Sequence, residues 1–272
     1  MQGRLSPEIF GRIQTFPVSY WKEEIYSASK LGFKQIEWTV DSKTIKQNPV
    51  IDSSQFQHIL YYMKKYKVSV NSITCDFFME NPLWKKNKLS IEMVRSIFLN
   101  LMNLSDSFGS LILVVPILDN SSLPSSKEFE LVIEMFEELH INRFPVKIAF
   151  ESDLEPENFF GLIKDLDQKQ FGVNLDIGNS AAYGFNPADE IAILGERIMN
   201  IHLKDRPMSG DSCRFGTGDT NFSLYLNLLK KIRYCGNLIL QSYRPETGFY
   251  FEELLYSSRY IKHIMGGECL AS

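Results

Sequence analysis

Apolar and polar positions alternate along this chain with two different periods, which predict strands and helices in turn. Short apolar runs bounded by polar or turn residues are typical of buried strands, whereas apolar residues at every third or fourth position indicate amphipathic helices. Seven strand-like runs read KQIEW, KVSVNSITCDF, SLILVVPI, VKIAFES, GVNLDIGNS, MNIHLKDR and NLILQSYR. MQGRLS is expected to be the end of one more strand, the first in chain order, which makes eight. Helices are expected over residues 20–31, 53–66, 89–108, 125–140, 155–166, 187–194, 222–232 and 251–265.

The order of these elements predicts the fold. Strands that alternate with helices at a spacing of ~30 residues form parallel sheets with right-handed crossovers. Eight such units in 272 residues predict a protein of the α/β class, a single (β/α)8 TIM barrel domain over residues 1–272. A doubly wound open sheet is the alternative. It usually carries a glycine-rich phosphate loop after its first strand, and GRLSPEIFG is not such a loop.

Three consecutive strands in the second half of the chain end on residues that can bind a metal ion. VKIAFES ends at Glu151, GVNLDIGNS at Asp176 and MNIHLKDR at His202. Active sites of such barrels lie at these carboxyl ends, where charged residues on apolar strands are costly without partners. We therefore expect one divalent cation there. Capping of the next helix or a surface salt bridge is the alternative for each residue.

Composition narrows the protein class. The formal net charge of −4 argues against a dedicated nucleic-acid binder, which usually carries a basic surplus. No apolar run approaches the ~20 residues that span a bilayer, so no membrane partner is expected. The four cysteines are scattered without a CxxC pair, and MQGRLSPEIF lacks the apolar segment of a signal peptide. We expect a cytoplasmic protein with reduced thiols.

The motifs around these strand ends resemble those of a known superfamily. Glu151, DIGN, NIHLKD and RFGTGDTNF are similar to the xylose-isomerase-like TIM barrels, which include sugar and sugar-phosphate isomerases and epimerases. The opening MQGRLSP, IEW and the late LQSYR resemble a bacterial subgroup often labelled sugar-phosphate isomerase/epimerase. The resemblance covers essentially the whole chain. It implies an enzyme that isomerises or epimerises a phosphorylated or acidic sugar through an enediolate.

The resemblance also implies a metal site, with one departure. In the superfamily's epimerases a Glu, an Asp, a His and a second Glu bind one divalent metal, and the two glutamates act as acid and base. Glu151, Asp176 and His202 match the first three positions, and the fourth falls on Gln241. An amide offers a carbonyl oxygen to Mn²⁺, Mg²⁺, Co²⁺ or Zn²⁺, but it takes no proton at neutral pH.

Three interpretations of Gln241 stay open. Glu151 alone could move a proton between adjacent carbons, as in an isomerase. A second base could come from elsewhere, with Glu157, Glu37 and Cys75 as candidates. In the third, the site binds but has lost or changed its chemistry.

Substrate recognition is expected at the same strand ends and in the loops after them. Arginine suits phosphate and carboxylate, and in RFGTGDTNF the glycines would let the backbone approach the substrate while Arg214 faces a hydroxyl or an anion. For the arginines, the alternative is a salt bridge to Asp205, Asp211 or Asp219. For the loop, the alternative is a flexible connector without a role in binding. The expected substrate-binding residues are Arg4, Glu37, Asn179, Arg206, Arg214 and Arg244.

Two other functions compete with a sugar isomerase. One is a metal-dependent hydrolase or lyase on the same barrel, including an endonuclease-like enzyme, although four histidines in 272 residues cannot supply a trinuclear zinc site. The other is a non-catalytic sugar-binding protein. Barrels of this group often pair, so a homodimer is among the expected assemblies.

Overall fold

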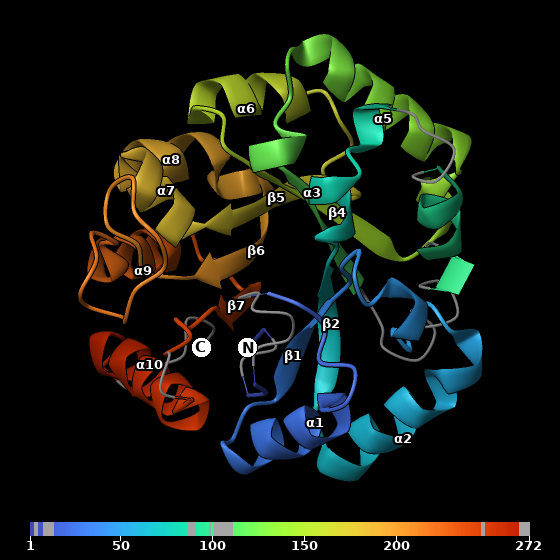
Figure 1. Ribbon diagram of the computed structural model, residues 1–272. Helices are drawn as coiled ribbons and strands as arrows, with labels where there is room; N and C mark the ends of the chain where they lie inside the picture. Colours follow the sequence, from blue (N-terminus) through green and yellow to red (C-terminus); the bar gives the residue numbers. More distant parts are fainter. Residues whose placement is uncertain are drawn as a thin grey trace.

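Seven parallel strands and the helices that connect them form a barrel in the computed structural model (Figure 1). The structure describes residues 1–2, 5–7, 14–85, 91–97, 99–100, 111–245 and 248–266. In these ranges the strands lie side by side in chain order, so each is hydrogen-bonded to the next. They are β1 (Gln35–Thr39), β2 (Ser69–Thr74), β3 (Leu111–Ile117), β4 (Val146–Ser152), β5 (Phe171–Asp176), β6 (Ile198–Leu203) and β7 (Asn237–Leu240).

The first two residues lie between β7 and β1. The backbone amide of Gln2 donates to Leu240 (3.1 Å), and that of Glu37 donates to Met1 (2.8 Å). Gln2 forms one parallel bridge with Glu37, whereas the Leu5 amide donates to the carboxylate of Glu24. The predicted eight strands are thus confirmed for seven only. In place of a strand over MQGRLS the described residues show a single bridge, because the backbone at Leu5 is already bound to a helix.

The outer helices match the predicted pattern closely. They are α1 (Trp21–Lys30), α2 (Phe56–Tyr66), α5 (Ser126–Glu138), α6 (Pro156–Ile163), α8 (Pro187–Leu194), α9 (Phe222–Lys231) and α10 (Tyr250–Ile264). Of the helix expected over 89–108, residues 91–97 and 99–100 are helical, and 89–90, 98 and 101–108 lie outside the described residues. Short 3-10 turns cover Ile45–Gln47, Ser53–Gln55, Leu83–Lys85, Asp119–Ser121, Ile141–Arg143 and Gly195–Arg197. Within the described ranges, none of the helices combines the length and apolar character needed to cross a bilayer.

Two short helices were not predicted, α3 (Phe77–Glu80) and α7 (Ile177–Tyr183). The second begins directly after β5, which ends at Asp176 as expected, so residues 177–180 of the run GVNLDIGNS are helical. The Asp176 carboxylate accepts hydrogen bonds from the amides of Gly178 and Asn179, both at 3.0 Å, and thereby caps the helix. The DIGN motif is thus a strand end and a helix start in one, and it fixes Asp176 at the carboxyl end of the barrel.

The two faces of the sheet differ in character. The outward face is aromatic and aliphatic, as where Phe150 of β4 stacks on Phe171 of β5 (6.2 Å between ring centres) beneath the helices. The inward face carries a polar layer: Asn200 donates to Glu37 (2.9 Å) and to Asn174 (2.7 Å), and Ser72 donates to Glu37 (2.7 Å). This buried layer satisfies its own carboxylate and forms the floor beneath the strand ends.

Candidate functional site

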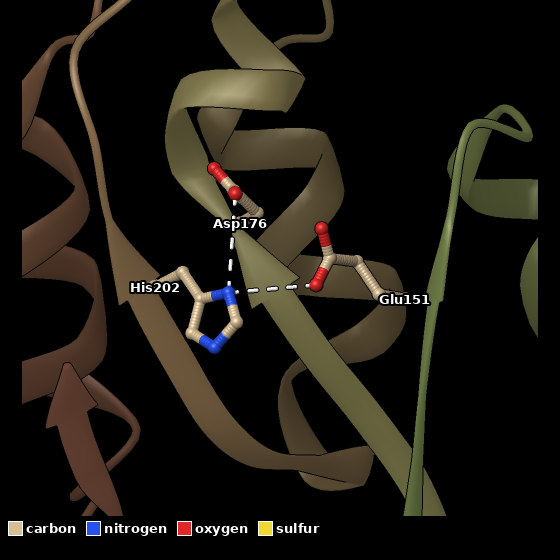
Figure 2. A group of neighbouring side chains, drawn as sticks. All are labelled: Glu151, Asp176 and His202. Atoms are coloured by element: carbon tan, nitrogen blue, oxygen red, sulfur yellow. Dashed lines mark ion pairs between the residues drawn. The ribbon is translucent and has the colours of Figure 1, made fainter. Parts of the chain in front are cut away.

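Glu151, Asp176 and His202 meet at the carboxyl ends of β4, β5 and β6 (Figure 2). One ligand atom of each lies within 4.8 Å of the others. His202 Nδ1 is 3.4 Å from Glu151 Oε2 and 3.9 Å from Asp176 Oδ2. Asp176 and His202 are register partners on neighbouring strands, which explains why they face each other. Two carboxylates and an imidazole so arranged are a donor set that divalent cations accept.

The other ring nitrogen of His202 faces Glu37. Nε2 lies 2.8 Å from Glu37 Oε1, and both side chains are almost fully buried. Burial alone would lower the pKa of His202, but the carboxylates of Glu37 and Glu151 raise it to about 10. A carboxylate behind a histidine orients the ring and leaves the remaining nitrogen for a metal. Glu37, expected to bind substrate, instead lies beneath the imidazole.

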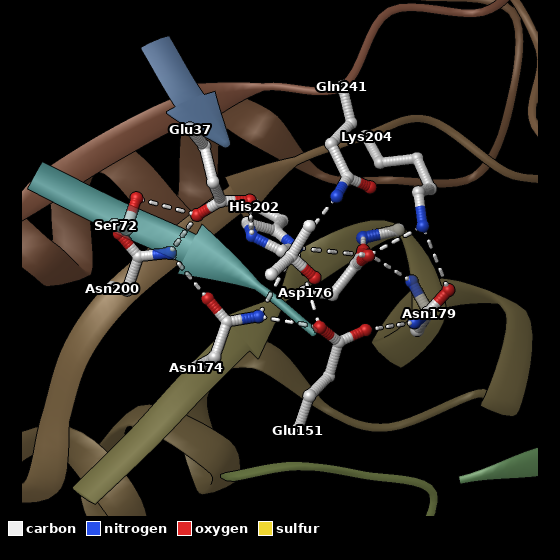
Figure 3. A network of polar contacts seen from close by, with 12 residues as sticks. Glu37, Ser72, Glu151, Asn174, Asp176, Asn179, Asn200, His202, Lys204 and Gln241 are labelled. Carbon is white, nitrogen blue, oxygen red and sulfur yellow. Dashed lines mark hydrogen bonds and ion pairs between the residues drawn. The ribbon is translucent and has the colours of Figure 1, made fainter. Parts of the chain in front are cut away.

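Amide groups fix the carboxylate of Glu151 (Figure 3). Asn174 donates to Oε2 at 2.7 Å, and Asn179 donates to Oε1 at 3.0 Å. Asn179 also accepts a hydrogen bond from Arg206 (2.7 Å). The orientation of Glu151 therefore depends on side chains from β5, α7 and the segment after β6.

Lys204 is a site residue that the sequence reasoning missed. Its Nζ lies 2.6 Å from Asp176 Oδ2 and 3.4 Å from Asn179 Oδ1. Burial would raise the pKa of Asp176, but the Lys204 ammonium and His202 hold it below its usual value. Lys204 follows His202 by two residues, and in a strand such residues share a face. That spacing was the signal available in NIHLKD.

Gln241, at the end of β7, completes the set. Its Nε2 lies 2.8 Å from His202 Nδ1, and its Oε1 is buried without a hydrogen-bond partner among the described residues. Oxygen and nitrogen exchange places when the amide turns by half a rotation. A buried carbonyl oxygen without a donor is costly, and a turned amide would direct it at the centre. The residues present thus fit one hard divalent cation.

A cavity of about 170 Å³ opens above this centre. Glu151, Lys204 and Gln241 line it from β4, β6 and β7, Arg206 from the segment after β6, and Asp76 and Asp119 from the ends of β2 and β3. A ligand in this cavity would therefore meet the candidate metal residues on one side and two aspartates on the other.

The expected arginine cluster is only partly assembled. Arg206 lines the cavity, where it donates to Asn179 and to the Gly210 carbonyl. Arg214 pairs with Glu253 (3.2 Å) and lies over the Tyr256 ring (4.0 Å), so it faces α10. Arg244 donates to the Ser6 carbonyl at 2.6 Å and is buried. Arg4 lies outside the described residues.

The glycine-rich loop is organised around Asp205. Its Oδ2 accepts hydrogen bonds from the amides of Gly216 (2.7 Å), Thr217 (3.2 Å) and Gly218 (3.0 Å), and Oδ1 accepts one from Thr220 (3.2 Å). A Cβ at Gly218 would collide with Asp205 Oδ1, and Gly216 has a φ of +86°. The glycines thus bring the backbone to Asp205, where the sequence led us to expect a substrate or a flexible connector.

The three candidates for a second base are placed unfavourably. Glu157 is exposed in the first turn of α6. Cys75 is fully buried, and burial followed by the charge of Asp76 raises its thiol pKa well above the usual value. Glu37 is occupied beneath His202. Asp76 and Asp119 are the aspartates that line the cavity instead, and burial followed by the charge of Glu151 raises the pKa of Asp76 to about 7.

Comparison with known proteins agrees with the fold. Over 219 residues the chain is 25% identical to a probable L-ribulose-5-phosphate 3-epimerase of Mycoplasma pneumoniae, covering 77% of this chain and 72% of that protein. A crystal structure of the IOLI protein with a binding zinc atom matches with a TM-score of 0.70 and 16% identity, over 91% of this chain and 93% of that one. D-psicose 3-epimerase with D-tagatose, from Clostridium cellulolyticum H10, matches with a TM-score of 0.69 and 13% identity, over 92% and 94%. The family model described as xylose isomerase-like TIM barrel matches residues 25–259, and the chain belongs to that family.

Proposed function

We propose that this protein is a divalent-metal-dependent isomerase or epimerase that acts on a phosphorylated or acidic sugar through an enediolate. One observation carries the proposal: Glu151, Asp176, His202 Nδ1 and Gln241 converge on one centre, with Glu37 behind the imidazole, and Glu151 and Gln241 also line the cavity above it. The names of the similar proteins, a pentulose-phosphate epimerase and a hexulose epimerase, support the reaction type.

Glu151, Asp176, His202 and the carbonyl oxygen of Gln241 would hold the ion. When bound there, a divalent cation supplies Lewis acidity toward a carbonyl and the neighbouring hydroxyl of a sugar. The zinc atom named for the similar IOLI structure supports a metal at this kind of site. Glu37 keeps the imidazole turned with Nδ1 toward the centre, and Asn174 and Asn179 fix the oxygens of Glu151.

The remaining side chains have separate tasks. Glu151 takes a proton from the carbon beside the carbonyl, since its carboxylate faces the cavity. Lys204 and Arg206 place two cationic groups at the cavity wall, which suits a phosphate or a carboxylate. Both are already bonded to Asp176 and Asn179, so an anionic substrate would share them with these partners.

The test combines metal binding with proton exchange. We expect Mn²⁺ or Co²⁺ to raise the melting temperature of metal-free protein, because an ion bound only by the folded chain stabilises it. We also expect NMR in D₂O to show deuterium entering the carbon beside the carbonyl of L-ribulose 5-phosphate or D-fructose, and Glu151→Gln to abolish it. A hydrolase would show no such label. Absence of both metal stabilisation and exchange would contradict the proposal and leave a sugar-binding protein.

A further inference from the structure

Inversion at a carbon needs proton transfer on both faces of the sugar, and Gln241 cannot provide the second transfer. A side-chain amide neither takes up nor releases a proton as a base or an acid at neutral pH. If Glu151 works from one face, as the proposed function requires, another acid or base must reach the same cavity. Glu157 is exposed, Cys75 is enclosed in the core, and Glu37 is already paired with His202.

Two aspartates line this cavity, and Asp76 is the half-buried one, whereas Asp119 is exposed. Asp76 follows β2 by two residues and lines the cavity together with Glu151, Lys204 and Gln241. Among the described residues, Asp76 accepts a hydrogen bond from the Thr74 hydroxyl at Oδ1 (3.2 Å) and none at Oδ2. The other oxygen is therefore available to a substrate bound in the cavity.

The usual structural reason for an aspartate at this position does not apply. Asp76 occupies the N-cap position of α3, but its side chain caps none of the helix amides. The amides of Phe77, Phe78 and Met79 donate instead to backbone carbonyls. Asp76 is half-buried, and among the described residues its carboxyl group neither caps a helix nor forms an ion pair. Burial of a carboxyl group without such a partner is costly. Its position over the cavity is what remains to explain it.

We propose that Asp76 is the second proton-transfer residue of this site, in the role that Gln241 cannot fill. Glu151 takes the proton from the carbon beside the carbonyl, and the C–H electron pair forms the enediolate. The acid form of Asp76 then gives its proton to the opposite face of that carbon, which makes the new C–H bond. Glu151 is left protonated and Asp76 ionised, and exchange with water restores both.

The two proton transfers can be measured separately in Asp76→Asn. With L-ribulose 5-phosphate or D-fructose in D₂O, we expect epimerisation to fall at least ~100-fold, in the range of a lost general acid or base. Exchange of the substrate proton with solvent should persist within a few-fold, because Glu151 is intact. Glu151→Gln should lose that exchange. Asp165→Asn, an exposed carboxyl at the end of α6, is the matched control and should leave both rates unchanged.

Further variants keep the proposal falsifiable. Asp76→Asn/Gln241→Glu places a carboxylate at the fourth ligand position and should regain part of the epimerisation. If circular dichroism shows that Asp76→Asn does not fold, Thr74→Val can be used instead, because it removes the hydrogen-bond donor of Asp76. In that variant epimerisation should fall while proton exchange persists, with a smaller fall than in Asp76→Asn. The role of Asp76 would be overturned if epimerisation persists in a folded Asp76→Asn variant. If that variant is unfolded, unaltered epimerisation in Thr74→Val would overturn it. Wild-type protein that exchanges no substrate proton would instead overturn the proposed function.

Discussion

Two polar regions adjoin β6 and differ in how their hydrogen bonds are used. At the centre formed by Glu151, Asp176 and His202, the neighbouring Gln241 keeps a buried oxygen without a partner among the described residues. In the loop of residues 205–220, the Asp205 carboxylate accepts hydrogen bonds from four backbone amides and is not among the residues that line the cavity above the centre. Saturated polar groups build architecture, whereas a polar centre with an unmet acceptor is suited to binding. Both regions follow apolar strands, so the difference is visible only in three dimensions.

The largest effect is expected from Asp205→Ala. It would remove four hydrogen bonds from loop amides to the buried Asp205 carboxylate. A hydrogen bond to a charged group contributes about 1.5–3 kcal/mol. We expect the free energy of unfolding in urea to fall by at least about 4 kcal/mol. Asp211→Asn, an exposed carboxyl in the same loop, is the control and should change it by less than about 0.5 kcal/mol. Equal stability of the two variants would contradict the architectural role of Asp205.

The rear of the centre contains a buried acid whose removal should change the pH dependence of stability. Ser180 (2.8 Å) and Tyr225 (2.6 Å) donate to Glu190, and Ser180 also bonds the Asp176 carbonyl. Burial raises the pKa of Glu190 from 4.5 to about 7. The folded state therefore binds this proton more tightly than the unfolded chain. Its contribution to stability is complete below pH 4.5 and is lost as the pH rises through about 7.

In Glu190→Gln this dependence should disappear. Between about pH 4.5 and about pH 8, the wild type should lose about 3 kcal/mol relative to the variant, since each pKa unit corresponds to about 1.4 kcal/mol. Urea midpoints at the two pH values measure the difference. Parallel pH profiles would show that Glu190 is not protonated in the folded protein.

A third variant addresses the carboxylate behind the imidazole. Glu37→Gln removes the charge next to His202 Nε2 but keeps the size of the side chain. We expect the affinity for Mn²⁺, measured by calorimetry, to fall about 10–100-fold, the usual effect of a partner behind a ligand. Glu196→Gln, an exposed carboxyl in the turn before β6, is the control. Unchanged affinity in Glu37→Gln would mean that Glu37 only stabilises the fold.

The smallest effect is expected from Arg214→Ala. The side chain is 51% exposed, pairs with Glu253 and lies over Tyr256. Surface pairs and exposed cation–π contacts contribute about 0.2–1 kcal/mol each, so stability should fall by at most about 1 kcal/mol. The KM for L-ribulose 5-phosphate should not change. A rise in KM of tenfold or more would show that Arg214 binds the substrate. The loop would then take part in binding, like the centre.

Sequence patterns predicted much of the fold because they record local requirements. The 3.6-residue period predicted α1, α5 and α9 to within a residue or so. The short helices α3 and α7 were missed because four to seven residues carry too little periodicity. For Asp176 the sequence left open metal binding or capping of the next helix, and in the structure its carboxylate ends β5 and caps α7.

Long-range contacts explain the remaining errors. A strand at MQGRLS would need the backbone of Leu5 to bond to the sheet, but its amide donates to Glu24 of α1. Glu37 lies in β1 and Gln241 directly follows β7, yet strand register places one beneath His202 and the other beside Nδ1. The arginine side chains carry the same charged group but point in different directions: Arg206 lines the cavity and Arg214 faces α10.

The sequence by itself determined the parallel order of the elements and the strand ends on which Glu151, Asp176 and His202 lie. A period of two or 3.6 residues records which side of its own element a residue faces. Tertiary structure decided that Glu37 stands behind the imidazole, that the glycine-rich loop surrounds Asp205 and that Asp76 opens on the cavity. These facts join residues far apart in the chain. Barrel closure and strand register, which no local pattern contains, bring them together.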